Sequence, residues 1–289
     1  MTRLEAIPPP SLVLLGIVSV QVGAGFAKNL FTELPPSAVV MLRLATSAVV
    51  LLLITRRLLR RTASRWTRAD LRVAAAFGLC LAVMNLAIYE SFSRIPLGIA
   101  VTIEFLGPLG IAVAFSRRRL DLVWVALAAA GVLLLMRGDP GRVNGVGVAF
   151  ALLAAAMWAA YILLSTATGR RFPGSSGLAL ASGLGTLLVL PVGVTTGGSD
   201  LLRPELLLLG AGIGLLSSVI PYTLELEALR RMPAKLFGIL MSLEPAVAAV
   251  VGLINLGEVL HLREWAAIGC VVVACLGATR SQAAAAPEA

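Results

Sequence analysis

Two glutamates lie inside apolar stretches of this chain that are bounded by prolines at the same spacing. The stretch "PLGIAVTIEFLGP", residues 96–108, holds Glu104, and "PAKLFGILMSLEP", residues 233–245, holds Glu244. An ionisable group inside a membrane is costly, and such groups usually face a partner, a cavity or a path for protons. The two segments therefore raise one question, which is what the surrounding chain uses these acids for.

The composition places both segments in a membrane protein. Hydrophobic residues make up 58% of the 289 residues and charged residues 13%, and the mean hydropathy is +0.94. A helix needs about 20 apolar residues to cross the hydrocarbon core, and the sequence lacks the period-2 alternation of a membrane barrel. We predict an all-α polytopic membrane protein with ten spans: 11–30, 37–55, 70–93, 95–116, 121–137, 145–166, 176–197, 206–229, 232–255 and 264–280.

The basic residues predict the orientation of these spans. With the N-terminus in the cytoplasm, 17 of the 24 Lys and Arg residues fall on the cytoplasmic side, six fall outside, and Arg43 lies within a span. Because cytoplasmic loops carry the excess of basic residues, both termini are expected on the cytoplasmic side. The net charge of +9 then reflects topology and contact with anionic lipid, so no nucleic-acid partner is expected.

One shift relates the two halves of the chain, because 233 − 96 and 245 − 108 both equal 137. The same shift aligns Pro36 with Pro173, Glu90 with Glu227, and Asp121 with Glu258. Copies of a five-span unit must enter the membrane from opposite sides, and such inverted repeats are typical of secondary transporters. We expect one repeat over 1–139, its inverted copy over 140–280 and a disordered tail over 281–289. Duplication for stability or assembly alone is the alternative.

The depth of the two acids favours a function. Glu104 lies eight residues after Pro96 and Glu244 eleven after Pro233, which places each roughly 12–17 Å into its helix, near the bilayer centre. The second prolines of the segments, Pro108 and Pro245, each free a backbone carbonyl about one turn earlier. Binding of substrate or proton is the functional interpretation. Structural pairing with a neighbouring helix is the alternative for the acids, and a packing kink is the alternative for the prolines.

Other polar and aromatic residues extend this candidate site. Arg43 lies deep in the second span and is suited to a substrate carboxylate or to neutralising an acid, whereas Lys28, near a span end, either snorkels to the surface or captures substrate. Aromatic and amide groups suit a cavity wall, although interfacial or packing roles fit them too; they are Gln21, Asn85, Trp158, Tyr161 and Tyr222. Acids near span ends suggest ion-paired gate or surface residues; these are Glu90, Glu225 and Glu227. No metal site or cofactor is expected.

Several longer stretches carry a family resemblance. They include "SVQVGAGFAKNLF", "MLRLA", "WAAYILLS", "PYTLELEAL" and "GILMSLEPAVAAVVGLINLGEVL". With these stretches the chain resembles, over nearly its whole length, the drug/metabolite transporter superfamily with duplicated EamA-type domains. Within that superfamily it is similar to the bacterial threonine and homoserine exporters. The resemblance implies efflux of small amino acids across the inner membrane, driven by proton entry.

Three functions remain open on the sequence. The first is a proton-coupled exporter of threonine, homoserine or similar small neutral amino acids. The second is a broader exporter of drugs, purines or other metabolites on the same scaffold. A structural or enzymatic membrane protein is the remote third, because the chain has no GxSxG or HExxH motif and its one histidine lies outside the spans.

Overall fold

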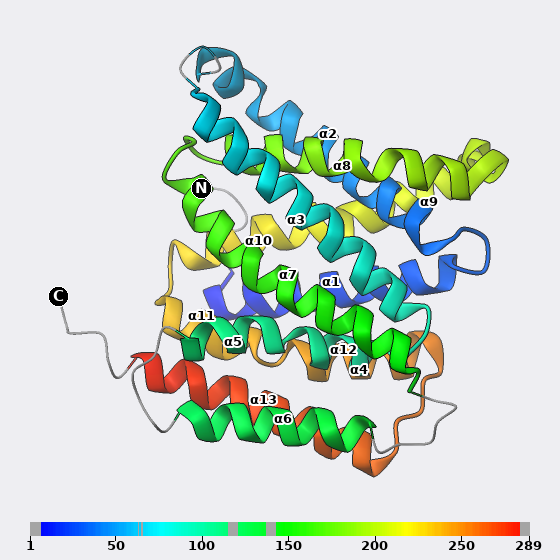
Figure 1. The fold of residues 1–289 in the computed structure, drawn as a ribbon, viewed down its shortest axis with the longest axis vertical. Coiled ribbons are helices and arrows are strands. Elements are labelled where there is room, and N and C mark those ends of the chain that lie inside the picture. The colour runs from blue at the N-terminus through cyan, green and yellow to red at the C-terminus, as the bar shows by residue number, and fades with distance from the viewer. Residues whose placement is uncertain (1–6, 63, 65, 115–120, 137–142, 284–289) are drawn as a thin grey trace.

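The chain is helical throughout the part that this computed structural model describes, which is residues 7–62, 64, 66–114, 121–136 and 143–283. Every regular element in those ranges is a helix (Figure 1). The elements are α1 (Pro9–Leu30), α2 (Pro36–Thr62), α3 (Arg68–Phe92), α4 (Leu97–Glu104), α5 (Leu106–Ala114), α6 (Asp121–Met136), α7 (Gly145–Gly169), α8 (Ser176–Gly197), η3 (Gly198–Leu202), α9 (Pro204–Gly214), η4 (Leu215–Val219), α10 (Ile220–Leu229), α11 (Ala234–Met241), α12 (Glu244–Leu256) and α13 (Leu262–Ala283).

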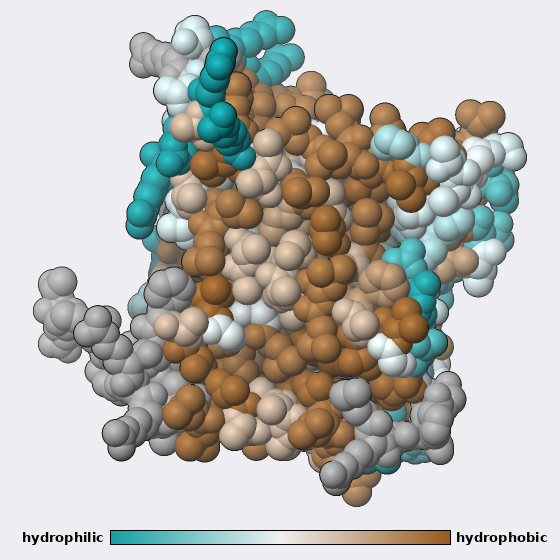
Figure 2. Space-filling model, viewed as in Figure 1, coloured by the Kyte–Doolittle hydropathy of each residue, from teal (hydrophilic) through white to brown (hydrophobic). Residues whose placement is uncertain are grey.

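Most of these helices are fit to cross a membrane. Among the described residues, eight helical segments are long and apolar enough, and two apolar helices are shorter, Leu97–Ile111 and Leu122–Leu135. The shorter pair lies where the sequence predicts the fourth and fifth spans. Figure 2 shows a broad apolar face with hydrophilic residues gathered toward opposite edges, as expected of a bilayer-spanning body. The prediction of an all-helical polytopic membrane protein is confirmed.

Two of the spans are interrupted, at equivalent places in the two halves. α4 gives way to α5 at Phe105, and α11 gives way to α12 after Ser242, 137 residues further on. Both residues have φ −63° and ψ −12°. Each break lies three residues before the second proline of its segment, where the missing N–H leaves the ladder of backbone hydrogen bonds incomplete. Pro96 and Pro233 cap the starts of the two interrupted spans.

A third span changes its winding without a break. Between α9 and α10 the five residues of η4 form a π-helix, in which each turn takes in one more residue than in an α-helix. The hydroxyl of Ser19 on α1 donates to the carbonyl of Leu216 at 2.7 Å, which satisfies one backbone acceptor of this wider turn. Turns of this kind are frequent at functional sites.

The helices pack in pairs that match across the two halves. α3 packs on α7 as α1 packs on α10, α3 packs on α8 as α2 packs on α9, and α6 packs on α13. Close approaches depend on small residues: a Cβ on Gly98 of α4 would lie 2.7 Å from Cα of Ala249 on α12, and one on Gly107 of α5 would lie 2.1 Å from the carbonyl oxygen of Ala155 on α7. The interrupted helices are thereby held against their neighbours at the centre of the molecule.

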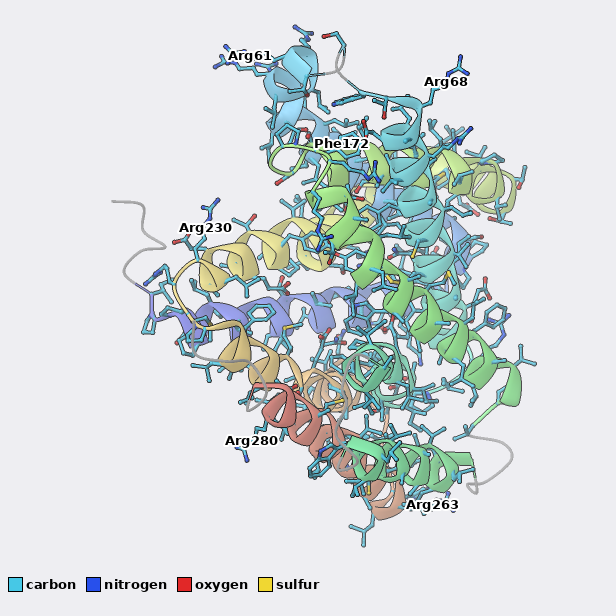
Figure 3. The ribbon with its side chains drawn as sticks, turned by 60° about the vertical axis from the view of Figure 1, so that its left-hand side comes forward. Arg61, Arg68, Phe172, Arg230, Arg263 and Arg280 are labelled. Atoms are coloured by element: carbon cyan, nitrogen blue, oxygen red, sulfur yellow. The ribbon has the colours of Figure 1, made fainter. Side chains whose placement is uncertain are left out.

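The ends of the spans carry most of the basic side chains. In Figure 3, Arg61, Arg230 and Arg280 project on the left of the view and Arg263 lies at the lower right. In Figure 1, α1 begins and α13 ends on the same side of the molecule. α13 continues to Ala283, so its last three residues are helical where the sequence predicts a tail, and residues 284–289 lie outside the described ranges.

Candidate functional site

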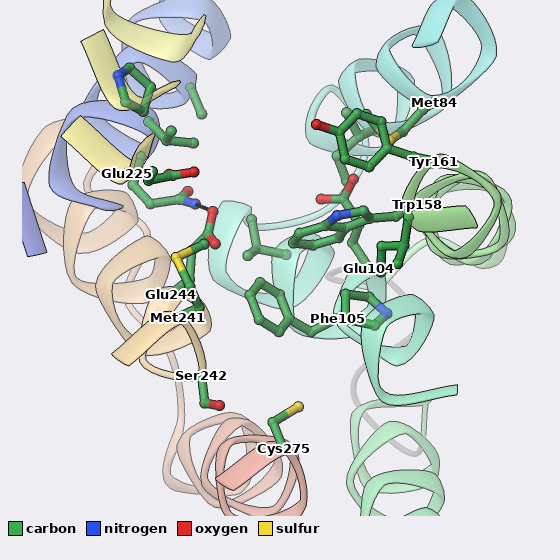
Figure 4. Close-up of a pocket in the computed structure, with 18 of the residues that line it drawn as sticks. Met84, Glu104, Phe105, Trp158, Tyr161, Glu225, Met241, Ser242, Glu244 and Cys275 are labelled. Carbon is green, nitrogen blue, oxygen red and sulfur yellow. Dashed lines mark hydrogen bonds between the residues drawn. The ribbon is translucent and has the colours of Figure 1, made fainter. Parts of the chain in front are cut away.

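One large cavity lies between the two interrupted helices. Its volume is about 840 Å³, and α1, α2, α3, α4, α5, α7, η4, α10, α11, α12 and α13 all contribute to its wall. Figure 4 shows Glu225 and Glu244 on one side of it and Glu104, Trp158 and Tyr161 on the other. The cavity gathers nine of the polar and aromatic residues that the sequence singles out: Gln21, Arg43, Asn85, Glu104, Trp158, Tyr161, Tyr222, Glu225 and Glu244.

Arg43 is the cation of this cavity among the described residues that line it. Its guanidinium donates to the Tyr89 hydroxyl at 3.2 Å and to the carbonyl oxygen of Ser217 at 3.1 Å, and it stands 5.3 Å from the centre of the Tyr89 ring. The carbonyl of Ser217 belongs to the π-helical turn of η4, which supplies Arg43 with a neutral acceptor. Because these partners carry no charge, the guanidinium remains able to bind an anion in the cavity.

Glu244 is held by a residue of the other half of the chain. The amide Nε2 of Gln21 donates to Oε1 of Glu244 at 2.8 Å. The second carboxyl oxygen, Oε2, has no hydrogen-bond partner among the described residues, and neither has the amide oxygen of Gln21. Gln21 is 2% exposed and Glu244 7% exposed. Two buried acceptors of residues that line the cavity thus lack a donor, an arrangement that buried polar groups seldom tolerate unless a ligand or water completes it.

The opposite wall combines Glu104 with aromatic rings. Phe105 and Trp158 meet edge to face, with ring centroids 4.8 Å apart. Tyr161 of α7 and Tyr222 of α10 also line the cavity. Glu104 interacts electrostatically with Arg43, but the structure records no ion pair between them within the described residues. This wall is therefore apolar over most of its area with one acid in it.

Three of the residues expected in the site lie outside the cavity lining. Lys28 forms an ion pair with Glu258 at 2.6 Å and donates to the carbonyl of Ile95 at 2.7 Å. Glu90 is paired with Arg94, and Glu227 lies 3.6 Å from Arg230 and 4.0 Å from Arg231. Under the 137-residue shift the Glu90–Arg94 pair corresponds to Glu227–Arg231. Of the four prolines, Pro108 lines the cavity.

The structure adds residues that the sequence did not single out. Ser217 lines the cavity, is 4% exposed, and its hydroxyl lacks a partner among the described residues. Phe105, Met84 and Cys275 also line the wall. The pair Ser217–Ser218 inside an apolar span is the one local signal for the first of them, and nothing in the sequence marks a π-helical turn there.

The charges of the cavity define what it can bind. Three carboxyl groups and one guanidinium line it within the described part of the chain. A positive and a negative locus suit a small zwitterion, and the apolar remainder of the wall suits a short side chain. The excess of acids over bases is neutralised either by protons on the carboxyl groups or by a bound cation, because unbalanced charge in a membrane interior is costly.

Comparison with known proteins defines the class. Residues 145–280 match the EamA-like transporter family, and this chain belongs to that family of the drug/metabolite transporter superfamily. It is 39% identical over 273 residues to the threonine/homoserine exporter RhtA of Escherichia coli (strain K12), covering 94% of this chain and 91% of that protein. RhtA of Salmonella typhimurium (strain SL1344) is 38% identical over the same coverage. A solved crystal structure with 15% identity superimposes with a TM-score of 0.62, covering 96% of this chain and 99% of the other, which shows a shared fold.

Proposed function

We propose that this protein is a secondary transporter that exports small neutral amino acids, threonine, homoserine or close analogues, in exchange for protons. The relatives named for threonine and homoserine export cover nearly the whole chain. The observation that carries the proposal is the cavity itself, which places the cation Arg43 and the acids Glu104 and Glu244 around one space between the interrupted helices. Arg43 binds the substrate carboxylate, because its guanidinium is otherwise held only by neutral acceptors.

Alternating access follows from an inverted repeat, which we assign to residues 1–139 and 140–280. The matched breaks at Phe105 and Ser242 and the identical extents of α4 and α11 under the 137-residue shift support it. The paired packing of helices across the two halves supports it as well. Rocking of one repeat against the other then exposes the central cavity to each side in turn.

We place both termini in the cytoplasm of a bacterial inner membrane. The excess of basic residues on one side of the membrane supports this orientation. The start of α1 and the end of α13 lie on the same side of the molecule, as an even number of spans requires.

Transport by the purified protein tests the proposal. Proteoliposomes loaded with labelled L-threonine or L-homoserine are given an inward proton gradient, and efflux is compared with empty vesicles. Efflux that depends on the gradient is expected, and it should fall at least tenfold in Arg43→Met, since truncating one partner of a buried charged contact costs roughly 2–5 kcal/mol. Wild-type vesicles that release neither amino acid faster than empty vesicles contradict the proposal.

One observation favours a second candidate, a broader metabolite exporter. A volume of about 840 Å³ lies toward the upper part of the ~300–1,000 Å³ range of small-molecule pockets and exceeds what a four-carbon amino acid fills. The aromatic wall of Phe105 and Trp158 also suits larger cargo. A thermal-shift screen of amino acids, purines and drug-like cations in detergent separates the two, because a ligand of the native state raises its apparent stability.

A further inference from the structure

The acids on one wall of the cavity are not balanced by any base. Arg43 interacts with Glu104, whereas Glu225 and Glu244 interact electrostatically with each other and lie on the same side of the cavity in Figure 4. No basic side chain among the described residues of the cavity lining stands beside these two acids. Keeping that wall neutral requires two positive charges from outside the protein.

The oxygens beside these acids form a set of acceptors without donors. Oε2 of Glu244 and the amide oxygen of Gln21 are both buried and both lack a partner among the described residues. The Gln21 amide group that donates to Glu244 fixes the two side chains relative to each other at 2.8 Å. Glu225 lies against α1 from α10, with its Cγ 3.5 Å from where a Cβ on Gly16 would stand. A primary ammonium brings three N–H donors and no acceptor, which is the complement of this set.

We propose that Gln21, Glu225 and Glu244 form the ammonium site of the cavity, and that the substrate ammonium and the transported proton exclude each other there. This inference rests on the proposed function and assigns the roles within its site. In the empty cavity each of the two acids carries a proton. When the ammonium binds to Oε2 of Glu244, one proton leaves that oxygen for the water of the cavity, and the charge of the wall is unchanged.

The other ionisable groups in and near the cavity leave this exchange to Glu225 and Glu244. Glu104 from α4 interacts with Glu244 and also with the guanidinium of Arg43 of α2, without an ion pair between them in the described residues. α10 adds Tyr222, α7 adds Tyr161 and α13 adds Cys275, all on the cavity wall. Glu258, on the segment after α12, is occupied by Lys28. The amide of Gln21, from α1, carries no charge.

Ligands that lack one end of the zwitterion test the site in the wild-type protein. Competition against labelled L-threonine in detergent is measured with threoninol, which keeps the ammonium, and with 2,3-dihydroxybutanoate, which keeps the carboxylate. Threoninol should compete, and 2,3-dihydroxybutanoate should bind roughly 10- to 100-fold more weakly than threonine, the loss expected for a hydrogen bond between charged groups. Equal binding of 2,3-dihydroxybutanoate and threonine overturns the ammonium site without the use of any variant.

Matched variants then assign the roles. Glu244→Gln and Gln21→Leu should each abolish most of the preference for threonine over 2,3-dihydroxybutanoate. Glu104→Gln removes a carboxyl charge from the opposite wall and should keep that preference whatever it does to overall affinity. The proposal is overturned if Glu104→Gln loses the preference for threonine over 2,3-dihydroxybutanoate while Glu244→Gln keeps it. That result would assign the ammonium to Glu104.

Proton release gives a second readout. Threonine added to the purified protein in weak buffer should release about one proton for each molecule bound, and threonine affinity should fall as the pH falls, because binding and protonation are linked. The double variant Glu225→Gln/Glu244→Gln should release none. Wild-type transport of threonine without proton release, or unchanged release in the double variant, contradicts the ammonium site alone. Absence of threonine and homoserine transport contradicts the proposed function instead.

Discussion

Two helix crossings that correspond under the 137-residue shift differ in how closely they are packed. α4 packs on α12, with Gly98 directly against the backbone of Ala249. The corresponding helices α11 and α5 do not pack together in this way over their described residues. They contribute Phe237, Met241, Pro108 and Leu109 to the cavity wall instead, and both pack on α13.

The end of the molecule beside the tight crossing is also tied by charge. The carboxylate of Glu258 forms an ion pair with the ammonium of Lys28 at 2.6 Å. It also accepts a hydrogen bond at 2.8 Å from the backbone N–H of Leu97, the first residue of α4. α1, α4 and the segment after α12 are thereby joined through one carboxylate. The position that corresponds to Lys28 in the second half is Ser165, which lacks such a charge. The α4–α12 crossing is thus closed, whereas α11 and α5 border the cavity instead of packing together. Under the alternating access proposed above, the two crossings would exchange these arrangements.

The largest expected effect comes from filling the tight crossing. Gly98→Val places methyl groups where a Cβ alone would already lie 2.7 Å from Ala249, so it should destabilise the protein by about 1–3 kcal/mol and stop efflux. Thermal unfolding in detergent and proteoliposome efflux measure both. Gly110→Val on α5 is the control, since nothing lies within 4 Å of a Cβ there. Equal behaviour of the two variants would mean that closure of the α4–α12 crossing is not needed.

Breaking the buried ion pair should have the next largest effect. Lys28→Met leaves the carboxylate of Glu258 without its cation, and because the side chains are 20% and 15% exposed we expect a loss of about 2 kcal/mol, below the ~3–5 of a fully buried pair. The double variant Lys28→Met/Glu258→Gln should recover part of the lost stability. Chemical unfolding in detergent gives both values, and additive losses would argue against a direct pair.

A smaller effect should be visible at a native thiol. Cys275 and Cys80 are both buried, at 7% and 4% exposed, but Cys275 lines the cavity beside the α5–α11 side, whereas the thiol of Cys80 donates to the carbonyl of Met157 at 3.0 Å. N-ethylmaleimide should label Cys275 faster than Cys80, and saturating threonine should slow the labelling of Cys275 a few-fold. Mass spectrometry of the two peptides measures both rates. Faster labelling of Cys80 would show that the α5–α11 side is not the more accessible part of the protein.

The smallest effect is expected from exposed charges. Arg203 binds Glu33 at 2.9 Å and Glu205 at 3.0 Å on the surface between α8 and α9. These partners raise the pKa of the Arg203 guanidinium above its ordinary value, yet exposed pairs contribute little to stability. Arg203→Ala should leave the unfolding temperature and threonine efflux unchanged. A clear loss of either the unfolding temperature or the efflux rate would show that these exposed ion pairs stabilise the protein more than expected.

The sequence predicts the helices of this molecule well and its long-range pairings poorly. Apolar length locates the spans to within a few residues, because a membrane constrains that length directly. The prolines of 96–108 and 233–245 locate both interruptions, because a missing N–H acts on its own helix. The shared shift brings Glu104 and Glu244 into one site. The partner of Lys28 lies 230 residues away, and no local pattern specifies it.

The π-helical turn of η4 is a second feature that periodicity does not reveal, since one surplus residue leaves the apolar composition of a span unchanged. The turn decides which way the rest of its span faces. Wound as an α-helix, the same five residues would turn the rest of the span further by about one residue, about 100°, so the π-helical winding of η4 sets the angular phase of Tyr222 and Glu225 relative to α9. Deleting one residue within Leu215–Val219 would return the segment to α-helical winding and leave both side chains facing the cavity, whereas forcing all five residues into an α-helix would turn them away. The direction in which a cavity acid points thus depends on the winding of the helix upstream of it as well as on the acid itself.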